Sequence, residues 1–379
     1  MRLSGNINII LIVLAFIQLF SSCVKMESAD RSESFSEIRF TSPVMTDATK
    51  AFATGSIGDY PKEEHFTVSA RYTTGDFVSW ESSVPYFDDM DAGYDETKNG
   101  WTTAKGTSAR TYYWPNSGKI TFAAYSPSSA PDDMTSLSYG KEGFTFTGFT
   151  VRSNPSQQYD LLYAPRAMNK TASSAGGSGI YDGVELNFRH ALSCVEFKVR
   201  NGSNYADSQI RINNIEVLNI YQRGSFAENI DVTDESVYNA SPQWTGQENE
   251  LGTGYSVAPS KIEQLVEEEA KPLEGARSLL LIPQDFNHGS SHVTILITYE
   301  TKTGANWIPQ APAVIDLVNG FDSDKDGVGD SYFNDGTNEI RGWEPGKRYT
   351  YMITFGRYKI FFTPSVSDWS DNNIPPVYI

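Results

Sequence analysis

Residues 195–199 read Val-Glu-Phe-Lys-Val, and this stretch indicates which secondary structure the chain favours. Its apolar side chains stand at every second position, with the two charged side chains between them. In a strand, successive side chains point to opposite faces, so the pattern predicts a strand with one buried and one exposed face. Cys194 precedes it on the face opposite Val195, and we interpret it as a packed structural thiol.

The same alternation recurs along the chain, with turn-forming residues between the runs. Further strands are predicted at 65–72, 120–125, 144–151, 184–188, 210–220, 279–282, 293–299 and 349–355. One helix is predicted at 261–271, where Ser260 caps the first turn and Leu265 and Val266 share a face with Ile262. Many short strands with one helix indicate an all-β fold of β-sandwiches.

The length and loop composition predict two domains in tandem. A chain of 379 residues exceeds the usual size of one domain. The Gly- and Ser-rich stretch 171–179 is typical of a flexible loop, so we place the domain boundary just after it. Residues 37–182 then form an amino-terminal sandwich and residues 183–379 a carboxyl-terminal one, each large enough for its own core.

The composition excludes several classes of protein. The net charge is −17, from 30 Lys and Arg against 47 Asp and Glu, which argues against a nucleic acid as partner. Aromatic residues make up 13% of the chain, too many for a disordered protein. Two cysteines and four histidines leave few ways to build a disulfide scaffold or a zinc site.

The amino terminus has the pattern of an export signal. The apolar run at 9–17 is too short to span a bilayer, which takes about 20 residues, and fits a secretory signal. Leu19-Phe20-Ser21-Ser22-Cys23 resembles the lipobox of bacterial lipoproteins, with Phe20 where Leu is common. We therefore expect residues 1–22 to be removed, Cys23 to be acylated and residues 23–36 to form a polar tether. The alternative is an ordinary signal peptide with an incidental cysteine.

The sequence contains no established catalytic motif, so we do not expect an enzyme. His288 and His292 have i,i+4 spacing, but Gly and Ser between them indicate a loop, and exposed loop histidines are the simpler interpretation. The acidic group at 88–91 is interpreted as a solvated loop.

One acidic motif suggests a structural calcium ion, and it is the only cofactor that the sequence suggests. Asp322, Asp324, Asp326 and Asp330 occupy positions 1, 3, 5 and 9 of a loop with glycine at position 6. Calcium takes six to eight oxygen ligands, and this spacing turns alternate carboxylates inward. Position 12 is Phe333 instead of the usual glutamate, so an acidic hairpin loop without metal is the alternative.

The carboxyl end carries a long alternating pattern, in which every second residue from Tyr358 through Ile360, Phe362 and Pro364 to Val366 is apolar. Two interpretations are open. The segment is the last strand of its own sandwich, or it is donated to another subunit whose sheet lacks a strand. A donated strand would bind by main-chain hydrogen bonds, and its alternate side chains would set the register.

Several blocks together resemble the fimbrillins, the type V pilin subunits and accessory proteins of Bacteroidales. The blocks follow the family order, and the resemblance extends over about residues 36 to 369. They are YYWP at 112–115, ITFAAYSP at 120–127, DLLYA at 160–164, LNFRHALS at 186–193, LIPQ at 281–284 and WEPGKRYTY at 343–351.

This resemblance implies two transthyretin-like, seven-stranded sandwiches in a lipoprotein of the outer membrane. It also implies removal of an amino-terminal strand by a trypsin-like protease, and polymerisation by strand exchange into an adhesive fimbrium on the cell surface. The displaced strand would include Ile38-Arg39-Phe40, with cleavage after Lys50, where the best-known members carry Arg. The donor would be the segment from Tyr358 to Val366. The partners would be other fimbrial subunits, the outer membrane and an adhesion target.

A different class of function is also open, namely a glycan-binding lipoprotein of the cell surface. Aromatic faces stack on sugar rings. Trp80, Tyr86, Trp101 and Trp114 are the candidates for such a platform, which requires that they lie exposed and together.

Overall fold

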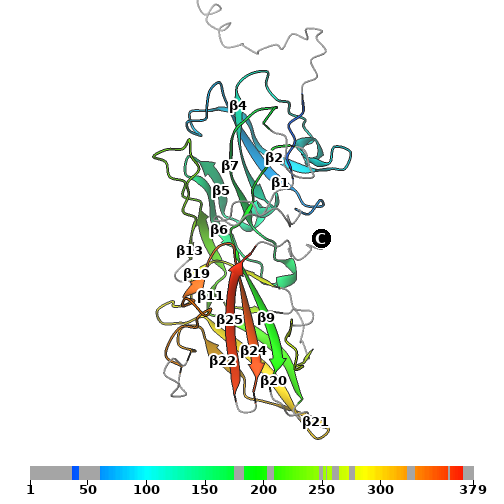
Figure 1. Cartoon of the computed structure of the whole chain (residues 1–379), viewed down its shortest axis with the longest axis vertical. Coiled ribbons are helices and arrows are strands. Elements are labelled where there is room, and N and C mark those ends of the chain that lie inside the picture. Colours follow the sequence, from blue (N-terminus) through cyan, green and yellow to red (C-terminus); the bar gives the residue numbers. More distant parts are fainter. Residues whose placement is uncertain are drawn as a thin grey trace, which may run out of the picture. The chain divides into compact units, whose positions relative to one another are not determined.

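The all-β prediction is confirmed by the computed structural model (Figure 1). The structure describes residues 36–41, 60–174, 183–202, 209–246, 251–252, 254–257, 264–272, 278–321, 329–356 and 359–369. Within these residues the only helical elements are short 3₁₀ turns, at Thr103–Lys105, Ala130–Asp133 and Pro155–Gln157.

The first sheet is antiparallel and has the strand order β3-β2-β1-β4-β7-β8. Its strands are β1 (Phe66–Thr73), β2 (Val84–Asp95), β3 (Gly100–Thr102), β4 (Lys119–Ser126), β7 (Leu162–Lys170) and β8 (Arg189–His190). The central strand β4 is buried on both faces. Phe122 and Ala124 belong to one hydrophobic core and Ala123 and Tyr125 to another, because successive side chains point to opposite faces.

The second sheet has the order β13-β12-β6-β5 and covers one face of the first. Its strands are β5 (Ser136–Gly140), β6 (Gly143–Thr150), β12 (Arg223–Ala227) and β13 (Gln243–Gly246). Tyr125 of β4 meets Phe144 of β6 edge-on, with 5.9 Å between the ring centroids. Since β6 pairs with β12, strands from both sides of residue 183 share this sheet. The domain boundary between residues 182 and 183 stays a prediction.

Two further sheets form a sandwich from the carboxyl-terminal half. One sheet contains β17 (Lys271–Pro272), β18 (Leu279–Leu281), β9 (Ser193–Asn201), β24 (Lys347–Phe355) and β25 (Ile360–Asp368), in which β9 and β24 are parallel. The other contains β15 (Tyr255–Ser256), β16 (Gln264–Leu265), β10 (Ile210–Leu218), β20 (Thr294–Thr303), β21 (Asn306–Pro309) and β22 (Ala313–Asp316). Short ladders join β11 (Ile220–Tyr221) to β14 (Leu251–Gly252) and β19 (Gln284–Asp285) to β23 (Gly342–Trp343).

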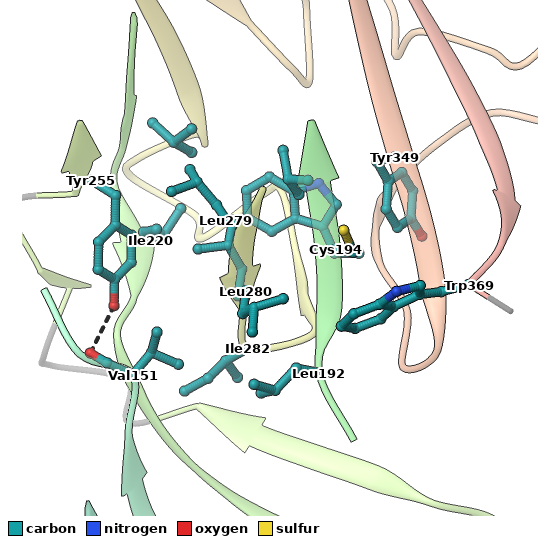
Figure 2. Close-up of a cluster of buried hydrophobic side chains, with 14 of the residues drawn as sticks. Val151, Leu192, Cys194, Ile220, Tyr255, Leu279, Leu280, Ile282, Tyr349 and Trp369 are labelled. Atoms are coloured by element: carbon teal, nitrogen blue, oxygen red, sulfur yellow. Dashed lines mark hydrogen bonds between the residues drawn. The ribbon is translucent and has the colours of Figure 1, made fainter. Parts of the chain in front are cut away.

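The alternation in β9 buries the residues that the sequence indicates. Val195, Phe197 and Val199 lie in the core, and Glu196 and Lys198 are partly exposed. Cys194 is also fully buried and free, beside Tyr349 and Trp369 in Figure 2. Its burial agrees with the interpretation as a packed structural thiol, and the same burial raises the pKa of the thiol to about 12.

The helix predicted at 261–271 is wrong. In the described part of this segment, Gln264–Leu265 forms β16, which pairs with β10. The amide of Val266 also donates to the carbonyl of Ile210 at 2.9 Å. An available strand edge therefore supplies the hydrogen bonds of this segment, and that pairing overrides a weak local helix preference.

Two other expectations need correction. The strand predicted at 184–188 forms no ladder; Val184 alone makes an isolated bridge there, to Phe40, although Leu186 and Phe188 are buried as expected. The acidic group at 88–91 is no loop, because it lies within β2. Its last residue, Asp91, is buried and is held by His65 and Thr107, whose contacts lower its pKa against the opposing effect of burial.

A buried carboxylate joins the second sheet to the loop that follows β12. Glu228 accepts hydrogen bonds from the amide of Phe144 at 2.9 Å and from the hydroxyl of Tyr238 at 2.8 Å. Burial raises the pKa of Glu228 from 4.5 to about 7. Since the folded chain holds this proton more tightly than the unfolded chain, the associated stability is present below about pH 4.5 and is lost as the pH rises through about 7.

We expect the free energy of unfolding to fall on the order of 3 kcal/mol between pH 4.5 and pH 8 through this group alone. Glu228→Gln cannot ionise, so its unfolding free energy should depend less on pH. Urea unfolding of both proteins across this range measures the difference. Equal pH slopes for the two proteins would show that folding does not shift the pKa of Glu228.

Candidate functional site

The segment 36–41 lies in a slot between β3 and the chain around Val184. The amide of Phe40 donates to the carbonyl of Trp101 at 2.9 Å, and the amide of Trp101 donates back at 3.1 Å. On the other side, the amide of Thr41 donates to the carbonyl of Val184 at 2.9 Å, and the amide of Val184 donates to Arg39 at 2.7 Å. The segment therefore uses both edges of its backbone, like an inner strand of a sheet.

The start of the segment is held in the same way. The amide of Ile38 donates to the carbonyl of Tyr112 at 2.8 Å, and the amide of Trp114 donates to the carbonyl of Ser36 at 2.9 Å. These partners belong to the YYWP block at 112–115. The block therefore forms part of the slot wall.

The floor of the slot is apolar. Ile38 is 2% exposed and Phe40 is fully buried. The ring of Phe40 meets Phe66 and Phe122 edge-on, at centroid distances of 5.7 and 5.6 Å. Burying one such side chain contributes about 1.5 to 3 kcal/mol. Loss of the segment would therefore expose an elongated apolar slot with unpaired backbone groups along it.

Polar contacts fix the segment along the slot. Glu37 forms an ion pair with Lys98 at 2.6 Å and accepts a hydrogen bond from the hydroxyl of Thr102 at 2.7 Å. The guanidinium of Arg39 donates to the carbonyl of Lys98 at 3.0 Å. A shift of the segment by one residue would break all three contacts and would turn Ile38 and Phe40 out of the core.

The chain returns to the core at Tyr60, which is 2% exposed. Its ring lies 5.8 Å from that of Trp101 and 5.9 Å from that of Phe188, and its hydroxyl is 2.5 Å from that of Ser126. Lys50, the predicted processing site, lies between Thr41 and Tyr60 and outside the described residues. A cut there would separate the segment 36–41 from the rest of the folded chain.

The carboxyl-terminal strand β25 pairs with β24 along its whole length, from Ile360 opposite Phe355 to Asp368 opposite Lys347. It is the edge strand of its sheet in the described part of the chain, next to β24 in Figure 1. Phe362 packs on Tyr351 and Phe333, at centroid distances of 4.9 and 5.0 Å. In this single chain, the segment is thus the last strand of its own sandwich.

The inner face of β25 is only partly covered. Ile360, Phe362 and Val366 are half-buried, Pro364 is buried, and Phe361 on the outer face is 47% exposed. Tyr358, the first residue of the predicted donor strand, lies outside the described residues. An edge strand with a half-buried face is more easily released than an inner strand, because it has one hydrogen-bonded neighbour instead of two.

Trp369 anchors the end of β25. Its indole stacks on the ring of His190 with 3.6 Å between the centroids, and its amide donates to the carbonyl of Gly346 at 2.9 Å. His190 in turn contacts the buried carboxyl of Asp160 at 2.5 Å. Burial raises the pKa of Asp160, although His190 opposes this effect. The end of β25 is therefore tied to β8, the last strand of the first sheet.

The family of the chain follows from a comparison with known proteins. Residues 47–369 match the model of a family described as fimbrillin-like. The chain belongs to the fimbrillin-like family. Fimbrillins are subunits of fimbriae, which are cell-surface appendages, so the chain is a fimbrial protein that assembles with other subunits. No match was found among curated proteins.

Three solved structures of bacterial proteins are similar to this chain. A candidate cell adhesion protein of Bacteroides uniformis is 12% identical, with a TM-score of 0.50, over 89% of this fimbrillin and 99% of that chain. A fimbrial protein of Bacteroides vulgatus is 18% identical, with a TM-score of 0.49, over 88% and 99%. The tip fimbrial protein Mfa3 of Porphyromonas gingivalis is 9% identical, with a TM-score of 0.36, over 88% and 100%. The first of these likenesses supports the sandwich fold.

The predicted sugar platform of this fimbrillin is wrong. Trp80, Trp101 and Trp114 are 4%, 0% and 6% exposed, so their faces are not available to a ligand. Tyr86 is partly exposed, and its hydroxyl donates to the carbonyl of Tyr113 at 2.5 Å. The tryptophans are core residues, as expected of large aromatic side chains in a sandwich.

The other predicted sites of the fimbrillin lie mostly outside the described residues. This holds for Cys23 and for Asp322, Asp324 and Asp326 of the acidic loop; Asp330 is described and exposed. Within the described ranges, no group of three or more potential metal ligands comes together. His292 pairs with Asp316 at 2.8 Å, and His288 lies against Tyr221. No helix of the described ranges is long and apolar enough to cross a bilayer.

The sequence singled out the segment around Ile38 and Phe40 and the alternating strand at the carboxyl end, but it did not indicate two contacts that hold them in place. One is the contact of Glu37 with Lys98 and Thr102, and the other is the stack of Trp369 on His190. The charges of Glu37 and Lys98 were visible in the sequence, but nothing in it brings together residues so far apart. The resemblance did mark one half of the stack, because His190 belongs to the block at 186–193.

Proposed function

We propose that this fimbrillin is a structural subunit of an adhesive fimbrium, exported as a lipoprotein and assembled by strand exchange after proteolysis. In this mechanism, acyl chains on Cys23 hold the precursor at the outer membrane. A trypsin-like protease cuts after Lys50, the segment 36–41 leaves its slot, and the carboxyl-terminal strand of a neighbouring subunit takes its place.

The observation that supports this mechanism most is the position of the segment 36–41. It is bonded along both backbone edges and carries two core side chains, Ile38 and Phe40. It nevertheless belongs to the amino-terminal end of the unit that begins at Ser36. A cut between Thr41 and Tyr60 would leave both neighbouring walls attached to the main chain, so only a strand of matching shape could fill the slot.

The proposed role requires no catalytic group. The protein would act by binding its own kind and by presenting a surface for adhesion. The energy of assembly would come from main-chain hydrogen bonds and from burial of apolar side chains.

The amino-terminal residue of the protein tests the processing steps. We expect Ala51 at the start of the protein in fimbriae isolated from cells, and an acylated Cys23 at the start of the membrane-bound precursor. Amino-terminal sequencing and mass spectrometry of the two fractions give the answer. Fimbriae whose subunits still begin at Cys23 would contradict assembly after cleavage.

Calcium binding by the acidic loop is a separate part of the proposal. We expect Ca²⁺ to release heat on binding and to raise the melting temperature, because Asp322, Asp324, Asp326 and Asp330 would supply carboxylate ligands. The variant Asp324→Asn/Asp326→Asn should show neither effect. Isothermal titration without heat in the unaltered protein would remove the metal from the proposal.

A further inference from the structure

The segment in the slot and the strand at the carboxyl end have similar sequences. Residues 37–44 read EIRFTSPV and residues 359–366 read KIFFTPSV. Four of these eight positions are identical. Between the last two identical positions, the first segment has Ser-Pro and the second has Pro-Ser. The identical pairs are Ile38 with Ile360, Phe40 with Phe362, Thr41 with Thr363 and Val44 with Val366.

The identical positions within 37–41 are those that the slot buries. Ile38, Phe40 and Thr41 are 2%, 0% and 4% exposed. The intervening positions differ: Arg39 is partly exposed in the slot, and Phe361 is 47% exposed on β25. The two segments therefore share the Ile and Phe of the inner face and the buried Thr, and they differ at the partly exposed positions 37 and 39, as two strands that fill the same slot would.

We propose that the donor is the carboxyl-terminal strand of a second copy of this chain, bound in one direction and one register. Ile360 takes the place of Ile38, Phe362 that of Phe40 and Thr363 that of Thr41, and the strand runs in the direction of the segment it replaces. This inference rests on the proposed function and specifies its partner and its geometry.

The backbone of the donor fits this register. The slot needs amide donors at the positions of Ile38, Phe40 and Thr41, which bond to Tyr112, Trp101 and Val184. Ile360, Phe362 and Thr363 all have an N–H group. Pro364 has none, and it falls one position beyond the last donor that the described slot requires.

Other alignments fit less well. A shift by two residues places Phe362 in the Ile38 site and Pro364 in the Phe40 site, where no N–H faces the carbonyl of Trp101. The reversed direction places Phe362 in the Ile38 site and Ile360 in the Phe40 site. That alignment forces a large ring into the smaller site and underfills the larger one.

Exchange also improves the burial of the donor side chains. Ile360 and Phe362 are half-buried on β25, whereas their counterparts in the slot are almost completely buried. The gain in apolar burial offsets the loss of the contacts with β24, including the stack of Phe362 on Tyr351.

One position of the register is unfavourable. Glu37 pairs with Lys98, and the donor brings Lys359 to the same place. Like charges would then meet beside Thr102, so the chain's own segment binds better at this end than the donor does. This difference favours the uncut state, and it predicts that a negative charge at position 359 strengthens the exchange.

Engineered disulfides read the register directly. The parent protein begins at Val24 and carries the recognition sequence of a specific protease in place of residues 45–50. Glu37 lies opposite Tyr113 in an antiparallel bridge, so a cysteine at position 113 should link to whichever donor residue takes the place of Glu37. The proposed register places residue 359 there, a shift by two places residue 361 there, and the reversed direction places residue 363 there.

The test compares the variants Lys359→Cys, Phe361→Cys and Thr363→Cys, each combined with Tyr113→Cys, after cutting and mild oxidation. We expect a ladder of disulfide-linked multimers only with Lys359→Cys, and none in the uncut variants. Cys194 is buried and is present in every variant, so any disulfide that it forms would appear equally in all of them. A ladder with Phe361→Cys or Thr363→Cys instead would overturn the register or the direction.

The other outcomes separate the inference from the function on which it rests. Polymers of the cut parent without any of the three links would overturn the register and leave strand exchange standing. A cut parent that stays monomeric would overturn both.

As a second readout, Lys359→Glu should speed polymerisation about 2- to 5-fold, whereas Ser365→Glu, on the exposed face of β25, should not. Equal rates for Lys359→Glu and the parent would contradict the placement of residue 359 beside Lys98.

Discussion

The double substitution Ile360→Asp/Phe362→Asp should abolish polymers of the cut protein. In the slot, both side chains would take sites that are 2% and 0% exposed, and two carboxylates cannot be buried there without partners. The loss should exceed 100-fold in the extent of polymerisation, because each buried carboxylate costs several kcal/mol. Sedimentation and electron microscopy of the cut variant measure the result.

The same variant should remain a folded monomer before cutting. Ile360 and Phe362 are only half-buried on an edge strand, so the uncut chain loses some stability but keeps its sheets. The matched control is Phe361→Asp, which places the charge on the outer face of the same strand and should still polymerise. Polymers of the double variant, or failure of Phe361→Asp alone, would refute the assignment of the donor face.

The substitution Phe40→Ala should destabilise the uncut protein by about 3 to 5 kcal/mol. Phe40 is fully buried and contacts Phe66 and Phe122, so its removal leaves a cavity in the core beneath the slot. Urea unfolding at constant pH measures the loss. Because the segment 36–41 is then held less firmly, the uncut variant should also exchange strands slowly without any cleavage.

Arg39→Ala is the control for this prediction. Arg39 is on the outer face of the same segment and donates one hydrogen bond, to the carbonyl of Lys98, so its loss should cost about 0.5 to 1.5 kcal/mol. Equal losses for the two variants would mean that the side chains in the slot do not provide the binding energy of the segment.

The sequence was sufficient to predict strands with a strong alternation and a clear core face. The run at 195–199 is an example, because its apolar residues face the sandwich core and its charges face outward. It was also sufficient to predict that Ile38 and Phe40 form one face of an extended segment. These features are local, since each follows from the two-residue period of a strand.

The errors arose where distant parts of the chain decide the local structure. The amphipathic pattern at 261–271 suits a helix, but β10 offers an edge to which Gln264 and Leu265 bind as a strand. The tryptophans at 80, 101 and 114 could equally have been exposed or buried, because burial depends on which sheet covers them. In the same way, the partners of Glu37 and Trp369 become apparent only when the strands are assembled.

The central claim is that cutting the chain between Thr41 and Tyr60 frees the slot for a neighbour's strand. Mass spectrometry of the products of such a cut tests it most directly. We predict filaments whose subunits have lost the fragment containing residues 36–41, with the fragment recovered in the soluble fraction. A cut protein that stays monomeric with the fragment still bound, or filaments that retain it, would contradict the claim.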